Sequence, residues 1–289
     1  MVTMQEIANQ VYIEEQYPGV ILGVISLPHG LVQIDAPPSP EDGRSWRALL
    51  LNLNTATERV LVNLDAHPDR TLGVRGMECT VIAHEKTVQA FRNRPNTFKA
   101  QGDETGADWE SVAGIGSVRW SLPEISFTNR MVIEWNDQRV ILEHHPGPTP
   151  GASWVIVPGA KVVFVGDLVL KNQPPFIAFC NLAEWIESLN KLIAQYPDYT
   201  VVSGRSGVVS QSVIQTQLEL LVNLDQKLEA LGQKRAGPEA LEPLAQELLA
   251  SIKAPADRQK QFARRLIYGL RHYYMRRYHP NMHIDNTEE

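Results

Sequence analysis

Short runs of alternating apolar and polar residues open the chain and predict strands. Residues 11–35 alternate in this way, and the turn-forming sequence LPHG at residues 27–30 divides them into a hairpin. Apolar residues at helical spacing then predict a helix over residues 45–57, and short apolar runs predict strands over residues 59–64 and 80–83. This order is typical of a sheet with helices packed on its outer face.

The middle of the chain repeats the strand pattern after one more helix. Residues 84–100 have the helical spacing of apolar residues, whereas residues 101–124 are polar and irregular. Five strands then indicate a second sheet, at residues 125–127, 131–135, 139–144, 153–157 and 161–165. A helix over residues 181–195, with Asn181 as its cap, and a short strand over residues 200–202 complete this part.

The composition changes after Gly207, where helices rich in Leu and Ala are predicted over residues 212–231 and 238–252, and a third helix over residues 255–278. The last of these helices repeats apolar residues every four positions, at Phe262, Leu266, Leu270 and Tyr274. Five arginines surround this stripe, at Arg258, Arg264, Arg265, Arg271 and Arg277. We interpret them as a solvated face, and a binding surface for an acidic partner is the alternative. The tail, residues 281–289, is expected to be frayed.

Length and charge limit the class of protein. With 289 residues, 43% of them hydrophobic, the chain is long enough for one large domain with an appendage. Its formal net charge of -6 gives no reason to expect nucleic acid or an anionic membrane as partner. The N-terminus lacks the pattern of a signal peptide, and no run reaches the ~20 apolar residues of a membrane helix. We therefore expect a cytoplasmic protein in which Cys79 and Cys180 are buried thiols.

A polar loop after the strand at residues 60–64 carries the most specific chemistry of the chain. It presents Asp65, His67, Asp69 and Arg70 within six residues. Metal sites are commonly made from His with Asp, because imidazole and carboxylate groups both donate lone pairs. Arg70 argues against a metal, since a guanidinium keeps its proton and has no lone pair to donate.

Three further segments have the form of site loops at the ends of predicted strands. They are PGPTPGA at residues 146–152, VVFVGDLVL at residues 162–170 and SGRS at residues 203–206. Together with the DAHPDR loop, they resemble the four motifs of the metallo-β-lactamase superfamily, particularly its thioesterase and glyoxalase-II-like branches. That family has HxHxDH, PGHTPGS, a strand ending in GD, and PGHG at these places and in this order. The resemblance covers roughly residues 10–208.

The resemblance implies an α/β (α+β) fold, the four-layer αββα sandwich, in which two mixed sheets share the edge that carries the site. This metallo-β-lactamase-like domain would comprise residues 1–208. Residues 209–289 are similar to the C-terminal α-helical extension with which some members of the family cover the active-site cleft.

The family's metal ligands, carried onto this chain residue by residue, give two altered sites. The first becomes Asp65, His67, Pro148 and Asp167, and the second becomes Asp69, Arg70, Asp167 and Arg205. Proline has no side-chain donor, and the two arginines put positive charge where the second dication would lie. The resemblance thus implies a degenerate metal site.

The three aspartates of these sites would repel one another if the metals were simply removed. Arg70 and Arg205 supply the opposite charge in a form suited to bidentate pairing with carboxylates. We therefore predict that an ion-pair cluster of these arginines with Asp65, Asp69 and Asp167 has replaced the second metal.

Four neighbouring residues are expected to have structural roles. His84 should cap, or hydrogen-bond within, the helix that follows it. His144 and His145, at a strand end beside the cleft, should be an exposed or hydrogen-bonded pair, and relocated metal ligands are the alternative. Ser206 lies beside Arg205, but the chain has no GxSxG sequence that would make it a nucleophile.

Three hypotheses of function follow. The first is a pseudoenzyme without a cofactor, whose cleft binds a small anionic ligand or a protein partner through Arg70 and Arg205. The second is a hydrolase of esters or thioesters with one weakly held Zn, Fe or Mn ion on Asp65, His67 and Asp167. Hydrolysis by the usual dinuclear zinc route is not expected, because its bridging hydroxide needs both metals. The third is an oligomer subunit, such as a homodimer formed through the C-terminal helices.

Overall fold

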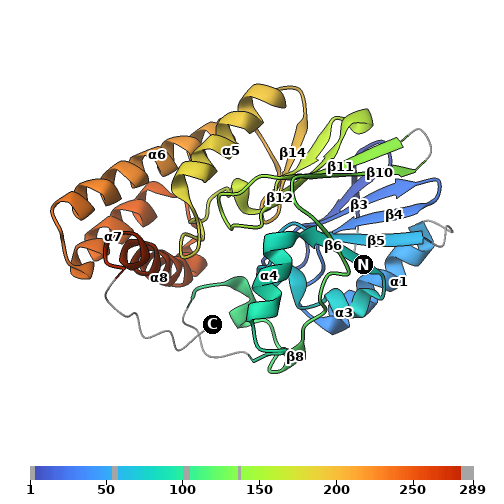
Figure 1. Ribbon diagram of the computed structural model, residues 1–289, viewed down its shortest axis with the longest axis horizontal. Coiled ribbons are helices and arrows are strands. Elements are labelled where there is room, and N and C mark those ends of the chain that lie inside the picture. The colour runs from blue at the N-terminus through green and yellow to red at the C-terminus, as the bar shows by residue number, and fades with distance from the viewer. Residues whose placement is uncertain (1–3, 54–57, 100–104, 136–137, 281–289) are drawn as a thin grey trace.

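Two β-sheets form the centre of the molecule, which a computed structural model describes over residues 4–53, 58–99, 105–135 and 138–280 (Figure 1). The seven-stranded sheet contains, in spatial order, β1 (Gln5–Ala8), β2 (Val11–Glu14), β3 (Leu22–Leu27), β4 (Gly30–Ile34), β5 (Glu58–Asn63), β6 (Thr80–His84) and β9 (Ile125–Phe127). The six-stranded sheet contains β10 (Arg130–Trp135), β11 (Gln138–His144), β12 (Ser153–Val157), β13 (Val162–Phe164), β14 (Thr200–Ser203) and β15 (Gly207–Val209). Strands β7 (Thr97–Phe98) and β8 (Val118–Arg119) form a small separate pair.

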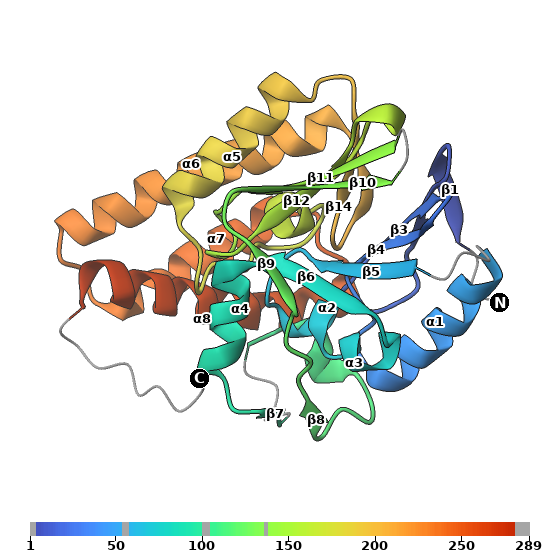
Figure 2. The ribbon, with the colours of Figure 1, turned by 45° about the vertical axis from the view of Figure 1, so that its right-hand side comes forward.

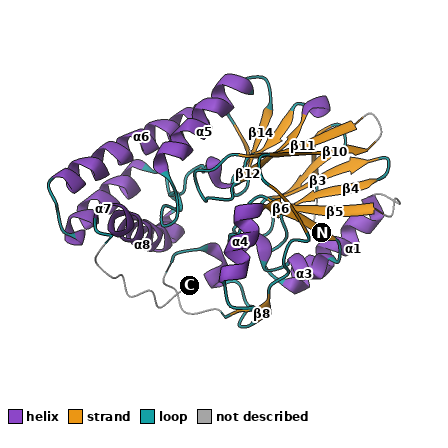
Figure 3. Cartoon of the chain, viewed as in Figure 1, coloured by secondary structure: helices purple, strands orange, loops and turns teal. Residues whose placement is uncertain are grey.

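Helices cover the outer faces of both sheets (Figure 3). Four helices lie between strands of the seven-stranded sheet in the sequence, namely α1 (Pro40–Leu53), α2 (Pro68–Thr71), α3 (Val74–Met77) and α4 (Glu85–Asn93). The six-stranded sheet is covered by α5 (Leu182–Gln195), and the chain ends in α6 (Gln211–Gln233), α7 (Leu241–Ser251) and α8 (Gln259–Tyr278). Short 3-10 turns are η1 (Asp108–Ser111), η2 (Pro158–Ala160), η3 (Gly166–Leu168), η4 (Pro238–Ala240) and η5 (Ala256–Arg258). The four-layer αββα sandwich expected from the motifs is confirmed.

The space between the sheets is filled by β-branched and aliphatic side chains. Val62 and Ile82 of the first sheet belong to one apolar cluster with Leu142 and Val155 of the second, and all are nearly or fully buried. A second cluster packs Trp46 of α1 against the outer face of the first sheet. Successive side chains of a strand point to opposite faces of the sheet, so neighbouring residues of one strand pack in different apolar clusters.

Parallel strands bring the motif loops to one edge. Strands β4, β5 and β6 are parallel neighbours, and so are β13 and β14. Each of four site residues lies within three residues of the carboxyl end of one of these strands, namely Asp35, Asp65, Asp167 and Arg205. Carboxyl ends of parallel strands meet at one side of a sheet, so residues far apart in sequence are gathered there.

The C-terminal helices pack with α5 on the outer side of the second sheet, away from the first sheet (Figure 2). One continuous apolar cluster runs from Trp154 and Val163 of that sheet through Leu189 of α5 to Leu221 of α6 and Leu266 of α8. The predicted stripe on α8 is buried at all four of its positions. The division at residue 208 stays a prediction, because the apolar cluster crosses it. Within the described ranges, no helix has the length and apolar character that crossing a bilayer requires.

Several element ends differ from the sequence prediction for local reasons. Helix α1 begins at Pro40, earlier than predicted, because the Ser39 hydroxyl accepts a hydrogen bond from the Asp42 N–H at 3.1 Å and caps it. Helix α4 ends at Asn93, ahead of Pro95, which disfavours helix in the residue before it. Strands β1, β7, β8 and β15 were not predicted. The predicted helix ends at residues 57 and 100 and the tail at 281–289 lie outside the described residues.

Candidate functional site

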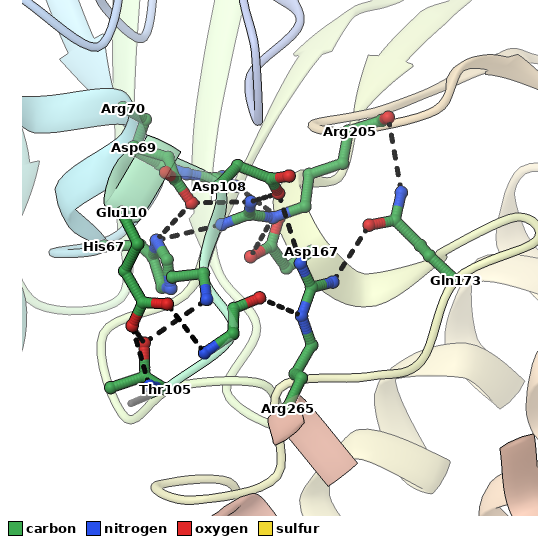
Figure 4. A network of polar contacts seen from close by, with 12 residues as sticks. His67, Asp69, Arg70, Thr105, Asp108, Glu110, Asp167, Gln173, Arg205 and Arg265 are labelled. Atoms are coloured by element: carbon green, nitrogen blue, oxygen red, sulfur yellow. Dashed lines mark hydrogen bonds and ion pairs between the residues drawn. The ribbon is translucent and has the colours of Figure 1, made fainter. Parts of the chain in front are cut away.

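Arg205, in the loop after β14, lies at the centre of the residues that the motifs singled out (Figure 4). Its Nε lies 3.0 Å from each carboxylate oxygen of Asp167. Its Nη1 donates to Asp69 Oδ2 at 2.7 Å, and its Nη2 lies 2.9 Å from His67 Nδ1. The side chain is 1% exposed, so one buried guanidinium holds three of the candidate site residues together.

Arg70 forms a second buried centre beside the first. Its Nη2 donates to Asp167 Oδ1, its Nη1 lies 3.4 Å from Asp35 Oδ2, and its Nε lies 3.3 Å from Asp65 Oδ1. All four side chains are at most 3% exposed. The predicted pairing of the two arginines with Asp65, Asp69 and Asp167 is therefore present. Asp167 is the residue that both arginines share.

The His67 ring is a hydrogen-bond acceptor toward Arg205. A guanidinium has only donors, so the 2.9 Å contact requires a lone pair on His67 Nδ1. The same nitrogen lies 3.1 Å from Asp69 Oδ2, and a lone pair cannot donate to that oxygen. We therefore assign the neutral imidazole with its proton on Nε2. The Nδ1 lone pair is thus directed at an arginine.

The carboxylates and guanidinium groups of the cluster stabilise one another's ionised forms. Burial opposes ionisation of Asp69, but the positive charge of Arg205 outweighs it and lowers the Asp69 pKa. Burial also opposes ionisation of Asp167, and Arg205 and Arg70 together hold its pKa well below the usual range. The carboxylates in turn raise the pKa of both arginines despite burial. At neutral pH these four groups are charged.

Asp35 is the exception among the buried carboxylates. Burial raises its pKa to about 7, which the charge of Arg70 only partly offsets, and the negative charge of Asp65 adds to the increase. Its Oδ1 accepts a hydrogen bond from the Leu64 N–H at 2.9 Å. Near neutral pH, Asp35 is therefore shared between its neutral and charged forms. None of the four motifs includes Asp35, so the sequence did not mark it as a site residue.

Local turns explain how the DAHPDR loop presents its side chains. Asp65 Oδ1 accepts from the His67 N–H at 2.8 Å, which closes a turn directly after β5. Pro68 then stands in the first turn of α2, where its missing N–H has no cost, and Thr71 Oγ1 donates to the His67 carbonyl at 2.8 Å. The short helix turns Asp69 and Arg70 inward, and both are fully buried.

Two glycines leave room for the cluster. Gly166 of the GD motif has φ +57, and a Cβ there would lie 3.2 Å from Arg70 Nη1. Gly19, between β2 and β3, has φ +76, and a Cβ there would lie 2.5 Å from Asp108 Cβ and 3.0 Å from Asp69 Cγ. A residue with a side chain at either position would displace these neighbouring atoms and would adopt a strained backbone conformation. The backbone at Gly19 therefore closes over the cluster.

Asp108 was missed by sequence reasoning, and it links the cluster to the C-terminal helices. It accepts from Arg205 Nη1 at 3.1 Å and from Arg265 Nη2 at 3.2 Å, and it also pairs with Arg258. It stands in η1, inside the stretch predicted to be irregular, and no motif marks it. Its buried neighbour Trp109 was the available signal that this stretch is ordered.

The prediction that Arg265 belongs to a solvated face is wrong. Its side chain is 1% exposed, and besides Asp108 it donates to the Gly106 carbonyl at 3.0 Å and to Gln173 Oε1 at 3.1 Å. Burial lowers its pKa to about 10. Arg265 follows Phe262 by three positions and precedes Leu266, so helical geometry places it at the flank of the buried stripe.

An aromatic ring lies between the two halves of the cluster. The guanidinium carbons of Arg205 and Arg265 lie 4.3 and 3.9 Å from the centre of the Phe176 ring. The His67 ring meets the same ring edge-on, with centroids 4.6 Å apart. Cations over an aromatic face are attracted to it. Phe176 and its loop thus cover the cluster from the side of α8.

The other candidate histidines have partners outside the cluster. His84 accepts from the Lys86 N–H at 3.2 Å and caps α4, as predicted. The His84 and His144 rings stack with centroids 3.7 Å apart. His145 stacks on Trp154 at 3.6 Å, and burial lowers its pKa to about 4. The Nε2 atoms of His144 and His145 lie 2.9 Å from the Pro150 carbonyl and 3.3 Å from Glu143 Oε2, respectively.

Ser206 and Pro148 also stand apart from the arginine contacts. Ser206 Oγ accepts from the Lys171 N–H at 3.0 Å, so it is bound to the loop after η3. Pro148 is buried between β11 and β12 and has no side-chain polar atom to contribute. Among the residues that the structure describes, no group of three or more His, Cys, Asp or Glu is arranged to hold a metal ion.

Comparisons with known proteins concern the family and the fold of the chain. Residues 66–205 match the sequence profile of the metallo-beta-lactamase superfamily. No curated protein is significantly similar to the chain. A metallo-beta-lactamase from Pontibacter korlensis superposes with TM-score 0.62 at 20% identity, covering 77% of this chain and 100% of that chain. One from Erythrobacter litoralis gives TM-score 0.58 at 14% identity, covering 77% of this chain and 96% of that chain. At such identities the likeness shows the fold.

Proposed function

The chain belongs to the metallo-β-lactamase superfamily, and on that premise we propose that it is a metal-independent, non-catalytic member that binds a ligand or a partner. One observation carries the proposal, namely the place of Arg205. Its guanidinium contacts Asp69, Asp167 and His67, which stand at metal-ligand positions of the motifs. The arginine then serves as the cation of the site, and the cluster is a structural core.

The donor set argues against a metal at the second position. Asp69 and Asp167 already accept from guanidinium groups, and a proposed ion would lie beside both Arg70 and Arg205. Two unit charges 4 Å apart repel by about 4 kcal/mol at an effective dielectric constant of ~20, and the charge of a dication doubles that cost. The residues present therefore do not suit the dinuclear centre that the family motifs imply.

Hydrolysis in this fold relies on a cation that lowers the pKa of a bound water. A guanidinium has no vacant coordination position and cannot take that role. The two serines near Arg205 are also engaged elsewhere, since Ser203 Oγ donates to the Val169 carbonyl at 2.5 Å and Ser206 Oγ accepts from the Lys171 N–H. Neither bond is made to a histidine that could act as a base. This favours binding over catalysis.

Metal analysis of protein purified without chelator, then incubated with Zn, Fe or Mn and desalted, tests the proposal. We expect no stoichiometric metal and no hydrolysis of generic esters or thioesters. The matched control restores the histidines of the motifs in one variant, Asp65→His, Arg70→His, Pro148→His and Arg205→His. That variant should retain zinc, which shows that the assay detects a rebuilt site.

Two outcomes would contradict the proposal. Two metal equivalents in the wild type would mean that the arginines leave the site. One equivalent that is lost in His67→Ala, together with ester or thioester hydrolysis, would establish the mononuclear hydrolase on Asp65, His67 and Asp167 instead. His67 suits this test because its side chain, at 15% exposure, is the least buried of the three.

A homodimer through the C-terminal helices is a separate proposal. Light scattering of the full chain tests it directly. Removing residues 209–289 would not, because Leu221 and Leu266 belong to the same apolar cluster as Leu189 of α5. Truncation would expose that cluster and could create association of its own.

A further inference from the structure

A surface groove separates α8 from η4 and the start of α7, at the end of the molecule away from α1 (Figure 1). Its volume is about 680 Å³. One bank is formed by residues between 238 and 242, and the other by residues of α8 between 267 and 275. We call it the α8 groove. It is separate from the arginine cluster, whose contacts from this part of the chain come from residues 258–265.

The two sides of the α8 groove have opposite charge. Together, η4 and α7 contain three glutamates and no lysine or arginine, and one of these glutamates, Glu247, pairs with Lys227 of α6. Helix α8 contains six lysines and arginines and no acidic residue. The chain as a whole has a net charge of -6, so α8 is a strong local exception to its average.

Arg271 and Glu242 are the charged residues that face each other across the groove. The Arg271 Nη2 lies 3.2 Å from Glu242 Oε1, and the two side chains are 53% and 61% exposed. Glu239 lines the same side as Glu242. Lys260 stands eleven residues, or about three helical turns, before Arg271, so it lies on the same face of α8. An exposed pair contributes little stability in water, so its members can pair with other charges at little cost.

The groove also offers apolar area. Ile267, Tyr268 and Met275 of α8 line it together with the charged residues. Phe179, in the loop before α5, is 58% exposed, and its ring centroid lies 6.4 Å from that of His272, which also lines the groove. Aromatic residues and methionine within a charged, exposed rim are typical of surfaces that contact another protein.

Opposite charges on its two sides make the α8 groove complementary to itself. A two-fold axis that runs along the groove sets α8 of one copy over η4 and α7 of the other, and symmetry repeats the contact. Each basic side then faces an acidic side. A partner with a single sign of charge would be repelled by one of the two sides. Helix α8, with 20 residues, is about 30 Å long and provides an extended contact.

We propose that the α8 groove is the contact surface between two copies of this chain. Arg271 of each copy faces Glu239 and Glu242 of the other, while Tyr268 and Phe179 are removed from water. The acidic partner considered for the arginines of α8 is then the acidic side of the second copy. This inference gives the homodimer considered above a defined surface, and it does not depend on the metal content of the site.

Light scattering of the full chain over a range of micromolar concentrations tests the inference. We expect a dimer that dissociates on dilution and weakens as salt is raised. Arg271→Glu and Glu242→Arg should each weaken association more than about tenfold, because each places like charges opposite one another. Both positions are exposed, so unfolding in urea should change little in either variant.

An equimolar mixture of these two variants separates contacts between copies from contacts within a chain. In a mixed dimer, position 271 of each copy faces the opposite charge at position 242 of the other. Within each variant chain, positions 242 and 271 still repel. The mixture should therefore recover association to within about threefold of the wild type, although neither variant associates alone. A pair that acts only within one chain predicts no recovery.

Matched controls reverse exposed charges elsewhere. Arg92→Glu, on α4, and Glu219→Arg, on α6, are at exposed positions outside the groove lining. Neither should change the dissociation constant of the dimer. A loss of association in these controls would mean that the net charge of the chain, rather than the groove, determines the response.

The inference is overturned if the full chain has the mass of one copy at the highest concentration, if its dimer is indifferent to both charge reversals, or if the mixture does not associate. A single copy that instead binds a poly-glutamate or polylysine peptide, detected by fluorescence anisotropy, would also overturn it and would assign the groove to a charged segment of another protein. Metal analysis tests the metal-independent role separately, so either proposal can fail while the other stands.

Discussion

Strand β5 and the loop after it contribute residues to two buried regions of opposite chemistry, one apolar and one ionic. Val62 is 0% exposed in the apolar cluster between the sheets, and Asp65, three residues later, is 1% exposed among arginines. The apolar cluster is stabilised by area removed from water, which each side chain contributes almost independently. The ionic cluster is stabilised only while its members face one another, since an unpaired buried charge costs several kcal/mol. The degree of burial of a region therefore does not by itself predict how much stability is lost when one of its residues is substituted.

Arg70→Met is the substitution with the largest expected effect on stability. It leaves Asp35, Asp65 and Asp167 without their shared cation, and we expect a loss of roughly 3–5 kcal/mol in the free energy of unfolding, measured by urea denaturation. Ile82→Val, in the apolar cluster, should cost only about 0.5–1.5 kcal/mol. Equal costs would mean that the cluster contributes no special sensitivity.

Arg70→Lys gives a second measure if Arg70→Met does not fold. Lysine keeps the charge but lacks the planar fork that contacts three carboxylates at once. Its cost should lie between that of Ile82→Val and that of Arg70→Met. A cost equal to that of the methionine variant would assign the stabilisation to geometry rather than charge.

Asp108→Asn should have the next largest effect. It removes the negative charge that Arg205, Arg258 and Arg265 share, at an expected cost of about 2–3 kcal/mol. Amide hydrogen exchange should also become faster at the start of α8. Asp257→Asn, an exposed neighbour in η5, is the matched control and should change neither quantity.

The two buried regions also differ in their response to pH. Folded Asp35 holds its proton up to about pH 7, whereas an unfolded carboxyl group loses it near pH ~4. The folded state therefore binds more protons in this window, and stability should fall as pH rises by up to about 1.4 kcal/mol per pH unit. Asp69 and Asp167, whose pKa values are lowered, act in the opposite direction and lose their contribution as pH falls below about 4.

Asp35→Asn isolates that effect. Urea denaturation between about pH 5 and pH 7 should show a negative slope for the wild type and a flatter one for the variant. Asp257→Asn should keep the wild-type slope. An unchanged slope in Asp35→Asn would mean that another group carries the pH dependence.

The smallest effect is expected for an ion pair in water. Lys191 Nζ lies 2.8 Å from Glu187 Oε1 on α5, and both side chains are at least 45% exposed. Lys191→Met should change the free energy of unfolding by less than about 0.5 kcal/mol, and salt should abolish the difference. A larger, salt-resistant effect would remove the distinction between exposed pairs and the buried cluster.

Motif order made the main elements and the cluster predictable. Asp65, Asp69, Asp167 and Arg205 follow strands whose apolar runs are visible in the sequence, and parallel strands bring such residues to one edge. The replacement of two histidine positions by arginine indicated which charges would pair. The apolar runs thus placed each loop after its strand, and the resemblance to the family's motifs indicated which loops would meet.

Asp108 and Arg265 could not be found in this way. Their partnership joins residues 157 positions apart, and it depends on how α8 docks rather than on any local pattern. Arg265 also had the composition of a solvated helix face, and only the flank position beside Phe262 distinguishes it from Arg264. Tertiary docking therefore decided the part of the site that the motifs do not describe.

The guanidinium of Arg205 is joined to the chain by covalent bonds, and this separates it from any ion that could stand among the same carboxylates. Under the proposed metal-independent role, synthesis of the chain would supply the cation, and maturation would need no metal delivery and no loading step. A chelator would then have nothing to withdraw from this centre, and a competing ion would have nothing to displace. Folding alone would complete the centre, and its cation content would be set by the sequence rather than by the surrounding medium.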